Sequence, residues 1–318
     1  GALNAQQVPG PWENLQITLP ARGDTPALTL HVLAAGPLDG ERVVLLHGFP
    51  DLARTWAGVF PLLSDRYRVL APDLPGYGGS DAPRDKHRYG ASVHARDLLD
   101  LLTASAVLDG QPATTPTHVV GHDWGAALGW MMALLGPDRV ASFTALDVPH
   151  PATFARFLKE VPEQRKRSQY MSLLALDGVD AIVAGMKTSR RDALYTENIK
   201  HPEAFTAQDS AWFAASFGTT AQTRGPLAYY QRKARDQRPN AMLVETLSPV
   251  RVPTLVLWGA DDAYLLAAMA EASCEQVKAG VPCRSAVLPN AGHWPQWEDP
   301  RWVAAQWRAF VAGEPAPE

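Results

Sequence analysis

Short apolar runs of strand length alternate along this chain with longer stretches of helical periodicity, and this alternation limits the fold more than any other feature of the sequence. The runs occupy residues 28–33, 43–46, 67–71, 118–120, 141–146, 255–258 and 284–288. The stretch between two of them, residues 92–106, places Val93, Leu98 and Leu102 largely on one helical face. Residues 43–46 are apolar without alternation, as in a strand covered on both faces. The pattern predicts parallel strands joined by crossover helices.

The alternation stops after Pro149-His150-Pro151 and resumes only at Thr254. Between these points residues 164–175, 204–217 and 225–234 have helical patterns. A helical insertion that follows the end of a strand lies where open α/β sheets bind ligands. At about 150 residues per domain, 318 residues could form two domains or one large unit. We expect an intermediate organisation, in which residues 1–150 and 245–318 form one core and residues 151–244 form a helical lid.

The composition excludes several classes of function. The formal net charge is −4 and neither sign forms a long block, so a nucleic-acid-binding face is not expected. No apolar run approaches the roughly 18 to 20 residues that cross a bilayer. Cys274 and Cys283 are nine positions apart without CxxC spacing, which argues against zinc and thiol redox chemistry and leaves two packed thiols or a disulfide open. A cytoplasmic location is favoured, and secretion stays open because the chain begins at Gly1 rather than Met.

The pentapeptide Gly121-His122-Asp123-Trp124-Gly125 lies between the run at 118–120 and the helical pattern at 126–135. Strand, tight turn and helix are the setting of a nucleophile elbow, G-x-Nuc-x-G, here with Asp123 where acyl hydrolases have serine. The glycines permit the tight turn. An aspartate that merely caps a helix would look the same over these five residues.

Other loops complete a catalytic constellation. Phe49 follows the run at 43–46, where its N–H and that of Trp124 would form an oxyanion hole. Asp262 and His293 follow the next two C-terminal runs, so the chain order is nucleophile, acid, histidine. Asp261 competes with Asp262. Asp147, which follows the run at 141–146, could also serve as the acid, although capping a turn is its simpler role.

With these residues in place, the chain resembles the epoxide hydrolase branch of the α/β-hydrolase superfamily from about residue 28 to residue 310. The resemblance rests on HGFP (47–50), PDLPGYGGSD (72–81), GHDWG (121–125), LDVPHP (146–151), WGADD (258–262) and AGHWPQWEDP (291–300). It implies a mostly parallel eight-stranded sheet with flanking helices and an inserted lid. It also implies an epoxide and water as the reacting partners, no metal or other cofactor, and a monomer or homodimer.

The resemblance further implies two lid tyrosines that donate hydrogen bonds to the epoxide oxygen. One belongs to a pattern similar to G-x-L-N-[WY]-Y-R, which here reads GPLAYYQ at residues 225–231 and places Tyr230 at the donor position. The usual Asn and Arg are Ala228 and Gln231 in this chain. The second donor would be Tyr170. Tyr229 competes with its neighbour for the donor role.

The same resemblance implies a substrate pocket bordered by four residues. They are Phe49, Pro50, Trp124 and Tyr229.

These residue types suit the opening of an epoxide. An aspartate, with an ordinary pKa of about 3.9, is already charged at pH 7, and a neutral tyrosine can donate to a developing alkoxide. The expected product is a vicinal diol, formed through an ester on Asp123 that water activated by His293 and Asp262 hydrolyses.

Two other functions stay open at this point. A haloalkane or haloacid dehalogenase could use the same triad, although Phe49 stands where haloalkane dehalogenases commonly have asparagine. A non-catalytic ligand receptor could keep the fold without turnover.

Overall fold

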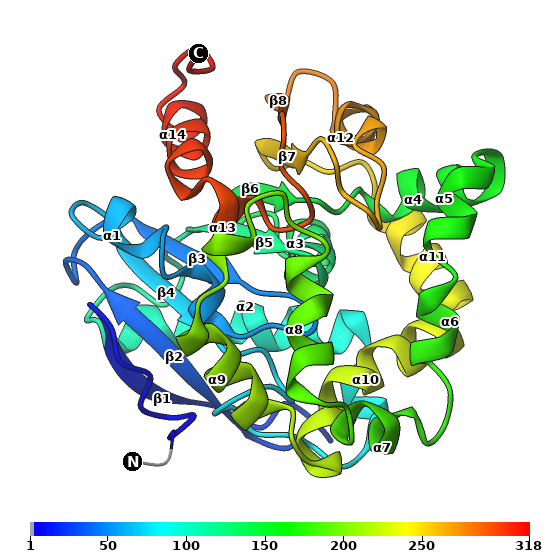
Figure 1. The fold of residues 1–318 in the computed structure, drawn as a ribbon. Helices are drawn as coiled ribbons and strands as arrows, with labels where there is room; N and C mark the ends of the chain where they lie inside the picture. The colour runs from blue at the N-terminus through cyan, green and yellow to red at the C-terminus, as the bar shows by residue number, and fades with distance from the viewer. Residues whose placement is uncertain (1–2) are drawn as a thin grey trace.

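The computed structural model describes residues 3–318 and contains an eight-stranded sheet with the order β1-β2-β4-β3-β5-β6-β7-β8 (Figure 1). The pairs β1–β2 and β2–β4 are antiparallel and the remaining neighbours are parallel. The strands are β1 (Glu13–Leu19), β2 (Leu28–Ala35), β3 (Arg42–Leu46), β4 (Arg68–Pro72), β5 (Thr117–His122), β6 (Val140–Leu146), β7 (Thr254–Gly259) and β8 (Cys283–Leu288). The expected mostly parallel, eight-stranded α/β fold is confirmed.

The seven apolar runs correspond to β2 through β8, whereas β1 had no counterpart among them. Its sequence, ENLQITL, contributes only Ile17 and Leu19 to the buried core, because β1 is an edge strand paired on one side. Such a half-exposed strand contains too few consecutive apolar residues to be recognised as a run.

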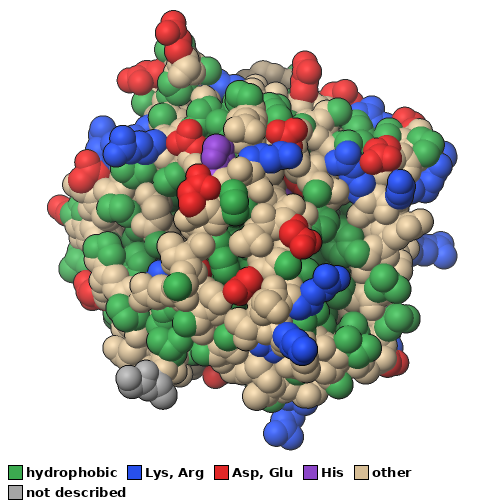
Figure 2. Space-filling model, in the orientation of Figure 1, with side chains coloured by type: hydrophobic (Ala, Val, Ile, Leu, Met, Phe, Trp, Pro, Cys, Tyr) green, Lys and Arg blue, Asp and Glu red, His purple; other side chains and the backbone are tan. Residues whose placement is uncertain are grey.

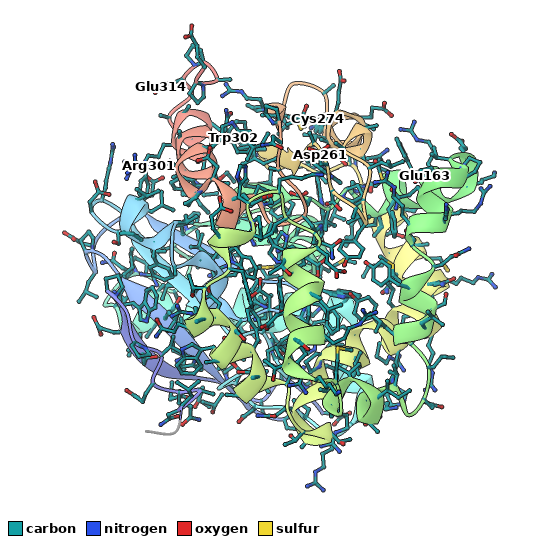
Figure 3. The ribbon with its side chains drawn as sticks, in the orientation of Figure 1. Glu163, Asp261, Cys274, Arg301, Trp302 and Glu314 are labelled. Atoms are coloured by element: carbon teal, nitrogen blue, oxygen red, sulfur yellow. A yellow bond between two sulfur atoms is a disulfide. The ribbon has the colours of Figure 1, made fainter. Side chains whose placement is uncertain are left out.

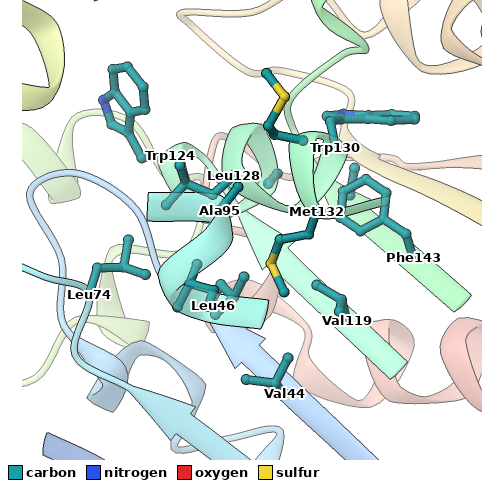
Figure 4. Packing of buried hydrophobic residues seen from close by; sticks show 14 of the residues in the cluster. Val44, Leu46, Leu74, Ala95, Val119, Trp124, Leu128, Trp130, Met132 and Phe143 are labelled. Carbon is teal, nitrogen blue, oxygen red and sulfur yellow. The ribbon is translucent and has the colours of Figure 1, made fainter. Parts of the chain in front are cut away.

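Two hydrophobic clusters cover the two faces of the sheet. Because successive side chains of a strand point to opposite faces, Val44 and Leu46 of β3 belong to one cluster, and Val43 and Leu45 belong to the other. The first cluster lies beneath α2 (Ala91–Leu108), α3 (Trp124–Leu135) and α12 (Ala268–Ser273), and Figure 4 shows Val44, Leu46 and Val119 packed against Leu128 and Met132. The second lies beneath α1 (Phe60–Leu63) and α14 (Pro300–Val311). This covering explains why β3 is buried throughout.

Eight α-helices follow β6 and precede β7 within the described residues, and they extend from α9, left of the centre of Figure 1, to α5 and α6 on its right-hand side. They are α4 (Pro151–Glu160), α5 (Pro162–Arg167), α6 (Tyr170–Leu174), α7 (Val179–Ala184), α8 (Thr188–Thr196), α9 (Ala207–Ser216), α10 (Thr220–Arg235) and α11 (Gln237–Leu247). The helical pattern at 164–175 is divided between α5 and α6. The separation of a lid at 151–244 from the core stays a prediction.

Cys274 and Cys283 form a disulfide, with their Cα atoms 5.7 Å apart. Cys274 follows α12, near the top of Figure 3, and Cys283 is the first residue of β8. The spacing of the two cysteines left open whether they are packed thiols or a disulfide. The structure shows a disulfide, because the end of α12 lies beside the start of β8.

The surface agrees with the charge balance of the sequence. Figure 2 shows acidic and basic side chains interspersed over one face of the molecule. Among the described residues, no helix combines the length and the apolar character that crossing a membrane requires.

Candidate active site

Asp123 stands at the sharp turn between β5 and α3, with φ 53° and ψ −124°. A non-glycine residue in this region is strained, and such strain is often found at functional sites. The flanking glycines make the turn sterically feasible. A Cβ atom on Gly121 would lie 2.4 Å from the Gly125 carbonyl oxygen, and one on Gly125 would lie 2.2 Å from the Leu46 carbonyl oxygen. The structure therefore has the strand–turn–helix geometry that the pentapeptide predicted.

Both oxygens of the Asp123 carboxylate have specific partners. The Phe49 N–H donates to Oδ1 at 2.8 Å, and Nε2 of His293 lies 3.1 Å from Oδ2. Trp124 is the first residue of α3, where a backbone N–H has no partner within the helix. Burial opposes ionisation of Asp123, but the hydrogen bond and charge of His293 outweigh it and lower the pKa of Asp123 to about 2. Asp123 is thus a buried carboxylate that is charged at neutral pH.

His293 lies between two carboxylates. Its Nδ1–H donates to Oδ2 of Asp262 at 2.6 Å, on the side of the ring opposite to Asp123. Burial alone would lower the pKa of His293, but the charge of Asp262 and the hydrogen bond to Asp123 raise it to about 10. Oδ1 of Asp262 accepts from the N–H groups of Tyr264 and Leu265, which orients the acid. The resting site therefore holds an imidazolium between two carboxylates.

Asp147 lies behind Asp262 rather than against the histidine. Its Oδ2 accepts from the Gly259 N–H at 3.1 Å, and its Oδ1 is buried without a donor. Burial, followed by the adjacent charge of Asp262, raises the pKa of Asp147 well above its usual value. A protonated Asp147 can donate to Asp262, and this hydrogen bond favours the ionised form of Asp262. Asp261, the other competitor, is exposed (Figure 3).

Tyr170, the first residue of α6, and Tyr230 of α10 both line the cavity that contains Asp123 and His293. Their ring centroids are 6.4 Å apart. Burial, reinforced by neighbouring charge, raises the pKa of each hydroxyl well above its ordinary value, so both are neutral donors at any working pH. The chain thus brings two neutral O–H groups to the same cavity as a charged carboxylate.

The cavity has a volume of about 260 Å³, and Phe49 and Pro50 line it as expected. Trp124 and Tyr229 are not among the residues that line it, and their contact with substrate stays a prediction. Residues that follow each other in a helix point about 100° apart. Tyr229 therefore faces the core when Tyr230 faces the cavity, and its hydroxyl donates to the Pro75 carbonyl oxygen at 2.7 Å.

Trp124 packs beside these two tyrosines, with its ring centroid 5.5 Å from that of Tyr229 and 5.2 Å from that of Tyr230. Figure 4 draws it with the buried hydrophobic cluster. Its side chain therefore supports the cavity wall rather than forming it.

Several residues that line the cavity were not predicted from the sequence. Tyr264 and Trp294 were detectable, because each follows a candidate triad residue within two positions in the same loop. Tyr195, Phe213 and Arg191 also line the cavity, and they come from α8 and α9. Nothing in the local sequence of these two helices distinguishes their cavity side from their outer side.

Within residues 3–318, the group of side chains close enough to share a metal ion is Asp147, Asp262 and His293. Their candidate ligand atoms lie within 4.8 Å of one another. However, Asp262 is already bonded to His293 and to two backbone N–H groups, and Asp147 faces Asp262. The candidate ligand atoms therefore already take part in the contacts between Asp147, Asp262 and His293 that keep the histidine protonated.

Comparison with known proteins gives consistent results. The family model described as alpha/beta hydrolase fold matches residues 41–300. The chain is 32% identical to epoxide hydrolase A of Mycobacterium tuberculosis over 91% of this chain and 96% of that protein. It is 31% identical to epoxide hydrolase 3 of Xenopus tropicalis over 89% of this chain and 75% of that protein. The crystal structure of epoxide hydrolase A from Mycobacterium thermoresistibile superposes with a TM-score of 0.76 at 28% identity, covering 96% of this chain and all 100% of that one.

Proposed function

The chain belongs to the alpha/beta hydrolase fold family, within its epoxide hydrolases, and from this premise we propose that it converts an epoxide and water into a vicinal diol through an ester on Asp123. The observation that carries the proposal is the shared cavity, in which Asp123 and His293 meet two neutral tyrosine hydroxyls. An ionised carboxylate opposite neutral O–H donors suits the opening of a strained ether.

In the first step, Oδ2 of Asp123 attacks a ring carbon and the bond from that carbon to the epoxide oxygen breaks. Oδ2 is the nucleophile because Oδ1 is held by the Phe49 N–H. The hydroxyls of Tyr170 and Tyr230 donate to the epoxide oxygen, and one of them transfers its proton to the alkoxide.

Formation of the ester changes the state of the histidine. The ester carries no charge, so His293 loses the attraction that Asp123 exerted in the resting site, and its pKa falls. The imidazolium proton then replaces the one that the tyrosine donated. A neutral His293, still hydrogen-bonded to Asp262, is the base that the second step requires.

In the second step, Nε2 of His293 takes a proton from water and the resulting hydroxide attacks Cγ of the ester. The negative charge develops on Oδ1, against the N–H groups of Phe49 and Trp124. The bond between Cγ and Oδ2 breaks as the tetrahedral intermediate collapses, and Oδ2 leaves with the substrate as an alkoxide that takes the proton held by His293. The diol leaves with the returned proton, and Asp123 is again a carboxylate.

The proposal is tested by interrupting the second step. The variant His293→Gln, incubated with styrene oxide, should gain the mass of one substrate, and the added mass should map to Asp123. A correctly folded variant that stays unmodified would count against the ester mechanism. Release of halide from a chloroalkane, without diol formation from epoxides, would favour the dehalogenase alternative.

The two tyrosines are tested separately from the ester. The double variant Tyr170→Phe, Tyr230→Phe should lose ring opening, because neither ring can then donate to the alkoxide. Tyr229→Phe is the matched control, since Tyr229 faces the core and not the cavity. Undiminished turnover by the double variant would remove both tyrosines from the mechanism.

We further infer an oxidising location for this enzyme. Disulfides persist in secreted and periplasmic proteins and are rare where thiols are kept reduced. The Cys274–Cys283 bond therefore supports the secreted alternative over the cytoplasmic one.

A further inference from the structure

Arg191 is the one arginine or lysine side chain that lines the catalytic cavity in the described part of the chain. It belongs to α8 and is only 9% exposed. Its Nη2 donates to the Ala184 carbonyl oxygen at 2.7 Å, whereas its Nε is buried without a partner. Across residues 3–318, no ion pair involves this guanidinium, although most buried charges in proteins are paired.

Other buried arginines of this protein follow that general rule. Arg42 and Arg68 share the carboxylate of Asp109, and Arg88 forms an ion pair with Asp97. Burying a cation costs free energy unless an anion or several acceptors offset the lost hydration. A single backbone carbonyl does so only in part for Arg191. Arg191 is among the residues that line a cavity with predominantly apolar walls, and a ligand in this cavity could supply the missing anion.

Arg191 lines the cavity one turn of α8 away from Tyr195, which packs on the neighbour of the catalytic histidine. His293 contacts Trp294, whose ring centroid is 5.2 Å from that of Tyr195 on α8. Arg191 is four residues before Tyr195, which corresponds to about 6 Å along the helix axis. At this position it contacts the end of α7, and Val183 and Met186 line the adjacent wall. Apolar residues from α7 and the segment after it therefore line the same cavity as the cation.

We propose that Arg191 binds a carboxylate on the substrate, so that the preferred epoxides carry an acid group at the far end of an apolar chain. This inference rests on the proposed function and names its substrate class. A guanidinium matches a carboxylate through two parallel N–H···O bonds. One cation balances one negative charge, so a monoanion fits better than a dianionic phosphate. The charge of Asp123 in the same cavity also disfavours a second negative group.

One cavity could hold both charges of such a substrate complex because each charge would have its own partner. Asp123 is paired with His293, and the carboxylate of the substrate would be paired with Arg191. The epoxide would then be presented to Asp123 in one direction, with its apolar chain along the wall formed by α7 and α8. Binding through Arg191 makes it a specificity residue, distant from the bond that breaks.

The test uses matched pairs of substrates that differ only in charge. We would measure kcat/KM for 6,7-epoxyheptanoate, 8,9-epoxynonanoate and 10,11-epoxyundecanoate, and for the methyl ester of each acid. Three proteins are compared: the wild type, Arg191→Met, and the control Arg190→Met, which removes an exposed arginine from the same helix. The variant Arg191→Lys keeps the charge without the planar fork.

We expect the wild type to prefer at least one acid over its methyl ester. Arg191→Met should lower kcat/KM for that acid by about 10- to 100-fold, the range for hydrogen bonds to charged groups, mostly through KM. Turnover of the ester should change little, Arg191→Lys should fall between the two, and Arg190→Met should behave as the wild type.

Two results would overturn the inference. Equal losses for acid and ester in Arg191→Met would assign Arg191 a structural role at the end of α7, and the absence of any acid preference in the wild type would exclude a carboxylate site. Both results are compatible with an enzyme that converts epoxides into diols, so neither one bears on the proposed function. If no epoxide is converted by the wild type and His293→Gln acquires no ester, the proposed function itself fails. A thermal melt of each variant identifies one that does not fold, and Arg191→Lys then provides the comparison.

Discussion

The two neighbouring carboxyl groups Asp262 and Asp147 permit a sharp prediction, because the same substitution to asparagine should impair catalysis at Asp262 and change it little at Asp147. Asp262→Asn removes a negative charge whose oxygen lies 2.6 Å from Nδ1 of His293. Asp147→Asn should change little, because an amide can replace a protonated acid. Its NH₂ can donate to Asp262 while its oxygen accepts from the Gly259 N–H.

The magnitude follows from the burial of these groups. Removing one partner from a buried ion pair costs about 3 to 5 kcal/mol. In the hydrolysis step His293 becomes charged when it takes a proton from water. If its charged form is destabilised by this amount in Asp262→Asn, the rate of ester hydrolysis drops about 10²- to 10⁴-fold. The ester should accumulate, because Asp123 still alkylates. Asp147→Asn should stay within about threefold of the wild type, since the charge on Asp262 is retained.

The stability of Asp147→Asn provides a second readout. In the native state the raised pKa of Asp147 retains a proton that the unfolded chain, with an ordinary pKa of 3.8, releases. Stability from this group is therefore complete below that pH and is lost as the pH rises toward the pKa of the folded state. An asparagine at position 147 does not titrate, so the variant does not lose stability in this way as the pH rises. The variant should gain stability relative to the wild type at pH 7.5, and the gain should vanish near pH 3.5.

The assay combines rapid quenching with intact-protein mass spectrometry, which measures the fraction of alkylated enzyme over time, and thermal unfolding at the two pH values. Loss of ester hydrolysis in Asp147→Asn equal to that in Asp262→Asn would refute the reasoning, because Asp147 would then be the acid that supports His293. A stability difference independent of pH would show that Asp147 is ionised in the native state.

Three further predictions concern the elbow, the histidine and the disulfide. Because the pKa of Asp123 is about 2, the rate of alkylation should be independent of pH between 4 and 9. The rate of ester hydrolysis should rise with pH, because this step needs neutral His293. Quenched-flow mass spectrometry measures both rates, and a hydrolysis rate that falls with pH would contradict this mechanism. Gly48→Ala would place a Cβ atom 2.2 Å from Cβ of Asp123 and should therefore lower kcat by about 100-fold or more. The rate of diol formation measures this effect, and near-normal turnover would contradict the close packing of Gly48 on Asp123. Replacing Cys274 and Cys283 by serine should lower the free energy of unfolding, measured in urea, by about 2 to 3 kcal/mol. Turnover should stay intact, and an unchanged free energy of unfolding would contradict this prediction.

The sequence was sufficient for much of the fold and for the reacting groups. The buried central strands were recognisable as apolar runs, the edge strand β8 was recognisable although it is only partly buried, and only β1 escaped. Asp123 and His293 could be identified for a related reason. Each lies in a short loop directly after such a strand, and neighbouring strand ends meet at one edge of a parallel sheet.

The tertiary structure decided how these local elements meet. The sequence favoured Asp262 over Asp147 as the partner of His293 but left both open, since both follow strand ends, and only their packing places Asp262 against the ring. The orientation of α10 assigned Tyr230 to the cavity and Tyr229 to the core.

The pairing of the two cysteines and the position of Arg191 have the same origin. Cys274 meets Cys283 because α12 ends beside the start of β8, and Arg191 lines the cavity because α8 presents that side to it. Local sequence determines which element forms and which side chains it carries. Which of those side chains share a cavity depends on contacts between segments far apart in the chain, and only the assembled fold brings these segments together.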